Sequence, residues 1–348
     1  MDLFRAVPGV KCGRIGVRAQ TGYGDTSFSQ ALHNGDSLFL VCRQHQNVHD
    51  KVYSRCKKRR QMPFYCFIIH TNFYKMRAMS TTLDRYIQNL IVTEPLMQPL
   101  FKEAIQALDL PPGSRGLDVG CGIGFQCLLL ADAVGPEGHV TGLDITPEFL
   151  TYGAEMIKNS GFMSRVTLEN GDMNALPFGD NTFDWLWSAN CAGYPAREPL
   201  PMVKELARVI KPGGKIALLI YASQMLLPGY PALEARLNAT PAGIAPFTAE
   251  MKPETHHMRV LGWFQRAGLE DVSVQTFVGG FHSPLSDEIR SAVEALIDMR
   301  WGSAEPEMRQ EEWALFRQLT KPNSPEYILN LPGYYGFIAV SMFRGKVV

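Results

Sequence analysis

The sequence contains no long hydrophobic run and no excess of charge of either sign. None of its apolar stretches reaches the roughly 18 residues that a membrane-spanning helix needs, so we expect no membrane span. The first 30 residues lack the continuous apolar core of a secretory signal. The 34 basic and 34 acidic residues balance, which argues against nucleic acid as a partner, because domains that bind it are usually basic. These absences favour a cytoplasmic protein.

Cysteine is scarce, and its spacing matches no metal site. The chain has 7 cysteines in 348 residues, an odd number without the paired spacing of zinc ligands. Free thiols of this kind fit a reducing compartment. We therefore expect neither a disulfide framework nor a metal ion.

The first 78 residues differ in composition from the remainder. Residues 1–80 carry 13 Lys and Arg against 4 Asp and Glu, and no helical or strand period persists there. The run 56–60, Cys-Lys-Lys-Arg-Arg, is compatible with a nuclear signal or a phosphate-binding patch. We interpret 1–78 as a poorly structured basic extension, with a mis-assigned start codon, a targeting tail and a small folded domain as the three explanations. Residues 79–348 are predicted to form the main domain.

The most informative feature present is a strand that runs into a glycine-rich turn. Residues 115–119 have the apolar character of a buried parallel strand, and Gly120, Gly122 and Gly124 follow at alternate positions. Glycines turn sharply and let a ligand approach bare backbone, and the helix expected next would face that ligand with its N-terminus. The spacing is not the dinucleotide pattern G-x-G-x-x-G, because Phe125 stands where the third glycine is required.

The turn G-x-G-x-G, with Asp118 two residues before it, resembles motif I of the class I S-adenosylmethionine-dependent methyltransferases. The resemblance implies an α/β fold with a Rossmann-like seven-stranded sheet and S-adenosylmethionine as cofactor. It places Asp118 near the methionine end of the cofactor. It also places the turn residues Gly120, Cys121, Gly122 and Gly124 against the cofactor.

Two later segments match the order that this family shows. The predicted strand 139–145 ends in Asp144 and Ile145, and the Asp144 carboxylate can accept two hydrogen bonds from ribose hydroxyls. The alternative for this position is a helix cap. Further on, Gly-Asp-Met before an Ala-Leu-Pro-Phe turn resembles the adenine-contacting segment. The resemblance implies that the Asp172 side chain accepts a hydrogen bond from the adenine amino group. It also implies that Met173 borders the adenine ring.

The second half of the sheet is also recognisable. Residues 183–190 are predicted to form the fourth strand, ending in Asn190, which we add to the cofactor contacts. The segment 208–214, Arg-Val-Ile-Lys-Pro-Gly-Gly, resembles the turn that precedes the family's fifth strand, here at 216–221.

Three segments are expected to cover the site. The entry segment 83–110 is predicted to form two helices, the second opening at Pro95, and Tyr86 is a candidate cofactor contact or a core aromatic. Insertions at about 222–255 and 279–333 carry apolar and aromatic residues, in the first among many prolines and in the second with helices predicted at 286–300 and 306–319. Because open α/β sheets bind ligands beyond the carboxyl ends of their strands, these insertions should form a cap. A packed cap core explains the same residues equally well.

The implied chemistry is methyl transfer to a small, apolar or aromatic acceptor. A base assists this transfer when the acceptor is a hydroxyl or a carbon acid. The candidates for a catalytic role are His256 and His257, with a surface or capping role as the alternative, and Tyr194 and Tyr221, which lie where the resemblance places the acceptor site. No motif identifies the catalytic group, the acceptor or the oligomeric state.

Two other functions stay open. An aminopropyl transferase normally places catalytic acids after the fourth strand, and residues 190–194 offer none. A non-catalytic S-adenosylmethionine-binding partner subunit would keep the glycine turn and the ribose acid. Arsenic methylation is disfavoured, because Cys121, Cys127 and Cys191 do not show the paired arrangement expected for it.

Overall fold

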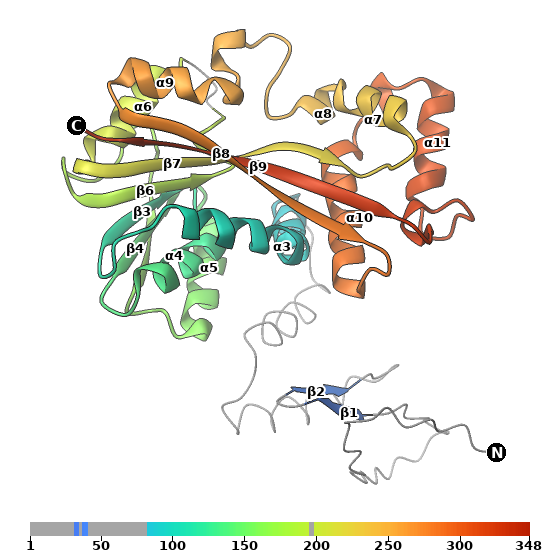
Figure 1. The fold of residues 1–348 in the computed structure, drawn as a ribbon, viewed down its shortest axis with the longest axis horizontal. Helices are drawn as coiled ribbons and strands as arrows, with labels where there is room; N and C mark the ends of the chain where they lie inside the picture. The colour runs from blue at the N-terminus through green and yellow to red at the C-terminus, as the bar shows by residue number, and fades with distance from the viewer. Residues whose placement is uncertain (1–30, 35–36, 41–81, 195–197) are drawn as a thin grey trace. The chain divides into compact units, whose positions relative to one another are not determined.

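The computed structural model describes residues 31–34, 37–40, 82–194 and 198–348 (Figure 1). The chain divides into two units, Met1–Lys75 and Met76–Val348. In the first unit, β1 (Ala31–Asn34) and β2 (Ser37–Leu40) pair antiparallel. The basic run 56–60 lies outside the described residues.

The second unit is built on a seven-stranded mixed sheet with the order β5-β4-β3-β6-β7-β9-β8. Strand β9 runs antiparallel to β7 and β8, and the remaining pairs are parallel. The predicted Rossmann-like, seven-stranded α/β fold is therefore confirmed. The strands are β3 (Arg115–Val119), β4 (His139–Asp144), β5 (Val166–Asn170), β6 (Phe183–Ala189), β7 (Ile210–Met225), β8 (Glu270–His282) and β9 (Tyr335–Lys346).

Helices cover both faces of this sheet. Figure 1 shows α3, α4 and α5 on one face and α6 and α9 on the other. Their bounds are α3 (Thr82–Ala107), α4 (Phe125–Val134), α5 (Pro147–Ser160), α6 (Pro199–Arg208) and α9 (Val260–Ala267). Coverage of both faces explains why Leu117, Val119 and Trp187 are fully buried, and why the central strands are nearly continuous in apolar residues. None of the described helices has the length and hydropathy to cross a bilayer.

The entry segment differs from the prediction of two helices, because α3 runs unbroken through Pro95 and Pro99. A proline inside a helix costs about 3 kcal/mol or more, since it removes a hydrogen bond and crowds the preceding turn. The helix packs against α4, α10 and β8, and Leu100 and Ile105 are each 2% exposed. Burial of this apolar stripe offsets the local cost, which the sequence pattern alone does not register.

The two insertions form a helical cap beyond the carboxyl ends of β7 and β8 and the amino end of β9 (Figure 1). The first contains α7 (Pro231–Asn238), α8 (Pro241–Ile244) and the turns η2 (Pro253–Thr255) and η3 (His257–Arg259). The second contains α10 (Asp287–Trp301), η4 (Glu305–Glu307), α11 (Gln310–Thr320) and η5 (Ile328–Asn330). It begins later than predicted, because β8 continues to His282 through Gly279 and Gly280, which are poor strand formers.

Side-chain contacts join the two insertions. The Trp301 indole Nε1 donates to Asn238 Oδ1 at 3.1 Å. The Arg236 guanidinium lies 2.7 Å from the Glu312 carboxylate. Residues from both insertions therefore form one packed cap.

Candidate functional site

The glycine turn between β3 and α4 lies where the strand order reverses direction, at the crevice that binds ligands in open α/β sheets. Gly120, Gly122 and Gly124 have φ values of +72°, +55° and +83°, a region open to glycine at little cost. A Cβ on Gly120 would lie 2.2 Å from the Cys191 sulfur, whereas one on Gly122 would meet no atom within 4 Å. Packing thus requires the glycine at 120, and Gly122 leaves its backbone open to a ligand.

Asp144, at the end of β4, fixes the shape of this turn. Its Oδ2 accepts a hydrogen bond from the Gly122 N–H at 2.9 Å. Its Oδ1 accepts one from the Thr146 N–H at 2.9 Å, and the side chain is 8% exposed. An ionised carboxylate offers about four lone-pair positions, so both oxygens keep capacity for further donors. Asp144 is therefore a support of the turn in addition to its predicted role as the ribose acceptor.

Asp118 supports the turn from beneath. It is 1% exposed, and the Cys127 thiol donates to its Oδ2 at 3.2 Å. Burial raises the pKa of Asp118 to about 7, with the Cys127 bond acting against the shift and Asp144 adding to it. The predicted contact of Asp118 with the methionine end of the cofactor stays a prediction.

Three cysteines gather around the turn, which their sequence spacing does not indicate. A Cβ on Gly142 would lie 2.7 Å from the Cys127 sulfur and 2.9 Å from the Cys121 sulfur, and Cys191 packs against Gly120. Burial raises the pKa of Cys191 to about 12, and a hydrogen bond with Cys121, followed by burial, raises the pKa of Cys127 well above its usual value. These thiols are protonated at neutral pH and therefore poorly reactive.

Two further side chains, Ile145 and Tyr86, are exposed on the side of the site that is predicted to bind the cofactor, which we call the donor end. Ile145 follows Asp144 and is 67% exposed, so a bound ligand could cover this apolar side chain. Tyr86 is 47% exposed and stacks on Phe149 with 5.8 Å between ring centroids. Burial of the hydroxyl, followed by the charges of Cys191 and Asp144, raises the pKa of Tyr86. Its position beside Asp144 favours the predicted cofactor contact over a core role.

The segment predicted to contact adenine is a tight turn after β5. Asp172 is exposed, and its Oδ1 accepts hydrogen bonds from the backbone and side-chain nitrogens of Asn174 at 2.9 and 2.8 Å. Met173 is partly buried against the core, which leaves mainly its backbone free to border a ring. Adenine recognition at Asp172 and Met173 stays a prediction.

Asn190 directly follows β6, and its side chain is hydrogen-bonded to the neighbouring strand β7. It has a φ of +51°, which Asn tolerates better than most residues. Its Oδ1 accepts hydrogen bonds from the Tyr221 N–H at 2.7 Å and from the Tyr194 hydroxyl at 3.4 Å. The side chain of Asn190 thus positions both predicted acceptor-site tyrosines, and its cofactor contact stays a prediction.

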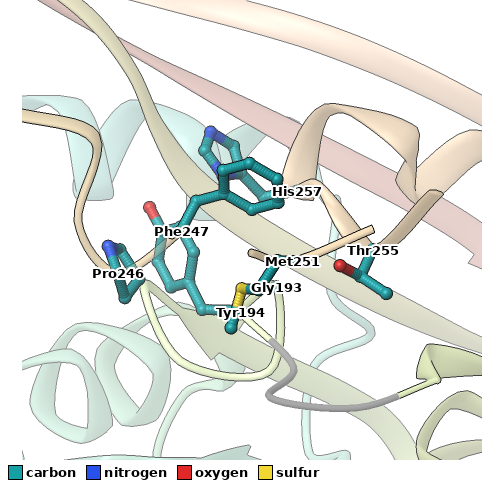
Figure 2. A pocket seen from close by; sticks show the side chains of 7 residues that line it. All are labelled: Gly193, Tyr194, Pro246, Phe247, Met251, Thr255 and His257. Atoms are coloured by element: carbon teal, nitrogen blue, oxygen red, sulfur yellow. The ribbon is translucent and has the colours of Figure 1, made fainter. Parts of the chain in front are cut away.

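A pocket opens beside the loop after β6, beneath the first insertion (Figure 2). The rings of Tyr194, Phe247 and His257 surround it. The complete lining is Gly193, Tyr194, Pro246, Phe247, Met251, Thr255 and His257. The apolar and aromatic side chains of the first insertion therefore wall a pocket as well as packing within the cap.

The two candidate histidines have different surroundings. His256 stacks on His257 with 4.0 Å between centroids, and its Nδ1 accepts a hydrogen bond from the Met258 N–H at 3.2 Å, so it caps η3. His257 faces the pocket and meets Tyr194 edge to face at 5.1 Å. Burial, followed by His256 and Arg300, lowers the pKa of His257 to about 4. Its imidazole is therefore neutral at pH 7, and its buried Nδ1 has no hydrogen-bond partner.

Arg300 is a site residue that the sequence did not single out. It lies on α10, and its guanidinium carbon is 5.5 Å from the centre of the Tyr221 ring. Its nitrogens donate to the carbonyl oxygens of Gly243 and Ala245 in the first insertion. The helix containing Arg300 was predicted, but helical periodicity does not indicate that α10 packs against α3 and α8 and brings Arg300 to the Tyr221 ring of β7.

Comparisons with known proteins agree with this geometry. A family profile described as "Methyltransferase domain" matches residues 117–214. The demethylmenaquinone methyltransferase of Bacillus cereus is 31% identical over 213 residues, which are 57% of this chain and 87% of that protein. The corresponding protein of Bacillus cytotoxicus is 37% identical over 140 residues, 39% of this chain and 57% of that protein. The chain thus spans little more than half the length of some of these relatives.

The chain belongs to the class I S-adenosylmethionine-dependent methyltransferases, whose cofactor is S-adenosylmethionine. The residues present fit that cofactor, because the open Cβ direction at Gly122, the Asp144 carboxylate and the exposed residue Ile145 lie together at the carboxyl ends of β3 and β4. Among solved structures, a SAM-dependent methyltransferase from Aquifex aeolicus is 23% identical, with a TM-score of 0.40 over 54% of this chain and 88% of that one.

Proposed function

We propose that this protein transfers a methyl group from S-adenosylmethionine to a small acceptor that carries an aromatic ring. The observation that carries this proposal is the pocket beside Tyr194, walled by Phe247, Met251 and a neutral His257. Sites for small organic molecules combine a mostly apolar lining with a few placed polar groups. This pocket has that composition, contains about 190 Å³ of empty space and is lined by Gly193 and Tyr194 of the loop that follows the fourth strand.

The donor side of the site is proposed to consist of the turn at Gly122, the carboxylate of Asp144 and the rim formed by Tyr86 and Ile145. When bound, S-adenosylmethionine supplies a methyl group already activated by its sulfonium charge. The chain's contribution is to align the acceptor atom at about 3 to 3.5 Å and to exclude water. Asn190 serves the alignment, because it fixes Tyr194 and the backbone of Tyr221 in one arrangement.

His257 is proposed to hold the acceptor hydroxyl through its unpartnered Nδ1. A group with a pKa of about 4 is neutral at pH 7 and a weak base, so it accepts a hydrogen bond more readily than a full proton. We therefore assign His257 to orientation of the hydroxyl. His256 is not proposed as a base, because its Nδ1 is engaged by the Met258 N–H.

The relatives named demethylmenaquinone methyltransferase make a reduced naphthoquinone the first acceptor to test. The experiment supplies methyl-labelled S-adenosylmethionine with reduced naphthoquinones, monohydric phenols and aromatic amines. We expect label in a hydroxylated ring; label confined to the amines would contradict the hydroxyl assignment of His257, and no label in any ring compound would contradict the proposed function. Tyr194→Ala should lower turnover more than affinity for S-adenosylhomocysteine, with the exposed Tyr335→Ala as a matched control.

Two alternatives remain testable in the same assay. The lining of the pocket includes no Asp or Glu, which disfavours aminopropyl transfer, and decarboxylated S-adenosylmethionine should therefore give no product. A non-catalytic partner subunit would bind the cofactor and label nothing alone. Its label would appear only when a second protein is added.

A further inference from the structure

Three side chains near the cap side of the pocket each carry a buried polar atom without a hydrogen-bond partner. Among the described residues, five buried side-chain nitrogen or oxygen atoms lack a hydrogen-bond partner. Three of them are the Tyr221 hydroxyl, His257 Nδ1 and Arg300 Nε, contributed by β7, η3 and α10. Buried polar groups are nearly always paired with protein, water or ligand. Three unpaired atoms from three distant segments therefore mark a place where another molecule binds.

Arg300 relates the three residues to one another and to the pocket lining. The Arg300 guanidinium lies 5.5 Å above the Tyr221 ring, and its charge acts on His257, Tyr194 and Tyr221 alike. Arg300 also donates to the Ala245 carbonyl, next to Pro246 in the pocket lining. Because His257 belongs to both the pocket lining and this cluster, the cluster borders the pocket.

The cluster carries one positive charge, at Arg300, and the carboxylate that acts on Tyr221, Glu234, is held by the Leu226 and Leu227 N–H groups and not by Arg300. In the described part of the chain, the Arg300 guanidinium forms no ion pair with a carboxylate, and its protein acceptors are two neutral carbonyl oxygens. A neutral His257 adds no second charge. A partly buried guanidinium pairs well with a carboxylate, because its planar donors match the two oxygens.

We propose that the methyl acceptor carries a carboxylate, which binds Arg300 Nε and the Tyr221 hydroxyl while the ring occupies the pocket. This inference rests on the proposed function, since it names the class of acceptor for the same site. It makes Arg300 and Tyr221 specificity-determining residues. It also distinguishes this site from one that takes a purely neutral ring.

A structural role for Arg300 predicts a different outcome. If the guanidinium only ties α8 to α10 through the Gly243 and Ala245 carbonyls, its loss lowers stability without changing the preference between charged and neutral ligands. Tyr221→Phe separates the two roles, because the Tyr221 hydroxyl bonds nothing in the free protein. Its removal should leave the melting temperature unchanged or higher, and should still weaken carboxylate binding.

The test uses benzoate and its neutral isostere benzamide as probes. Their binding to the full-length protein saturated with S-adenosylhomocysteine is followed by NMR titration. We expect benzoate to bind at least about tenfold more tightly than benzamide. Arg300→Gln should abolish this preference, Arg300→Lys should retain part of it, and Tyr221→Phe should reduce it. Arg290→Gln is the matched control on the same helix, where Arg290 donates to Asn330.

Several results would overturn the proposal. These are equal affinity for the two probes, no measurable binding of either, a preference that persists in Arg300→Gln, or an equal loss in Arg290→Gln. An ordered water that fills the cluster would give the first result. The proposed function fails separately: charge preference without methyl transfer to any ring would refute the function, and methyl transfer without charge preference would refute only the carboxylate.

Discussion

The carboxylate of Asp144 holds the backbone N–H of Gly122 at 2.9 Å, so the end of β4 sets the shape of the turn after β3. A residue predicted to bind ribose is thereby a structural part of the loop that is predicted to bind the cofactor. Loss of this carboxylate should affect the cofactor site in two ways.

Asp144→Ala should lower the affinity for S-adenosylhomocysteine by roughly tenfold or more, because charge-assisted hydrogen bonds are worth about 1.5 to 3 kcal/mol. The melting temperature should also fall, since the Gly122 and Thr146 N–H groups lose their acceptor. Calorimetric titration and thermal melts measure both effects. Asp132→Asn, an exposed position on α4, is the control, and an unchanged affinity in Asp144→Ala would refute the assignment.

Substitutions of Gly120 and Gly122 should have opposite signatures. Both have positive φ, which costs an L-residue about 1 to 2 kcal/mol. Gly120→Ala adds a clash with Cys191 at 2.2 Å and should lower the melting temperature of the free protein further. The double variant Gly120→Ala/Cys191→Gly should recover part of that loss.

Gly122→Val projects into open space, so it should abolish cofactor binding with a smaller change in melting temperature. Thermal melts with and without S-adenosylhomocysteine separate the two glycines. Normal stabilisation of Gly122→Val by the ligand would show that the turn does not contact it.

The stability of the protein should fall with rising pH through Glu94. This residue on α3 is 8% exposed, its Oε1 has no hydrogen-bond partner, and burial raises the pKa of Glu94 to about 8. The folded state keeps a proton that the unfolded state releases above its ordinary pKa, so stability is lost between about pH 5 and 8. The loss is on the order of 5 kcal/mol.

Glu94→Gln should remove this loss, so its melting temperature should exceed that of the unmodified protein at pH 8.5 and match it near pH 4.5. Glu103→Gln, exposed on the same helix, should show no such pH dependence. An equal shift in melting temperature at both pH values would indicate a packing effect instead.

His257 should not titrate within the working pH range. Because burial holds the pKa of His257 at about 4, kcat/KM for an acceptor that does not itself ionise should stay level from pH 8 down to about 5. A histidine with the ordinary pKa near 6.5 would produce a falling limb below that value. A pH–rate profile measures this, and an inflection near 6.5 that disappears in His257→Gln would contradict the assignment.

Removal of the N-terminal residues should leave the main domain intact. A chain that begins at Met79 should keep its cofactor affinity and melting temperature, since Met1–Lys75 form a separate unit from Met76–Val348. Calorimetry and circular dichroism on the two proteins provide the comparison. Loss of folding in the shortened chain would assign the extension a structural role.

The sheet and the glycine turn could be predicted from the sequence because their signals are local. Gly120 to Gly124 and Asp144 each follow a short apolar strand, and a parallel sheet brings the carboxyl ends of such strands to one edge. The unbroken α3 could not be predicted, because tertiary burial of residues such as Leu100 overrides the proline signal. Arg300 was missed for a related reason: its contact with Tyr221 joins positions far apart in the chain, and no periodicity records that.

The contacts between the two insertions should also make the cap unfold locally as one unit. Arg236 to Glu312 and Trp301 to Asn238 bind helices that lie on opposite sides of β8 in the sequence. The backbone amides of α7 and α10 should therefore exchange with solvent deuterium in a single cooperative event, at a free energy below that of the sheet. In native-state hydrogen exchange, the cap would behave as one unit of local unfolding assembled from two pieces of chain.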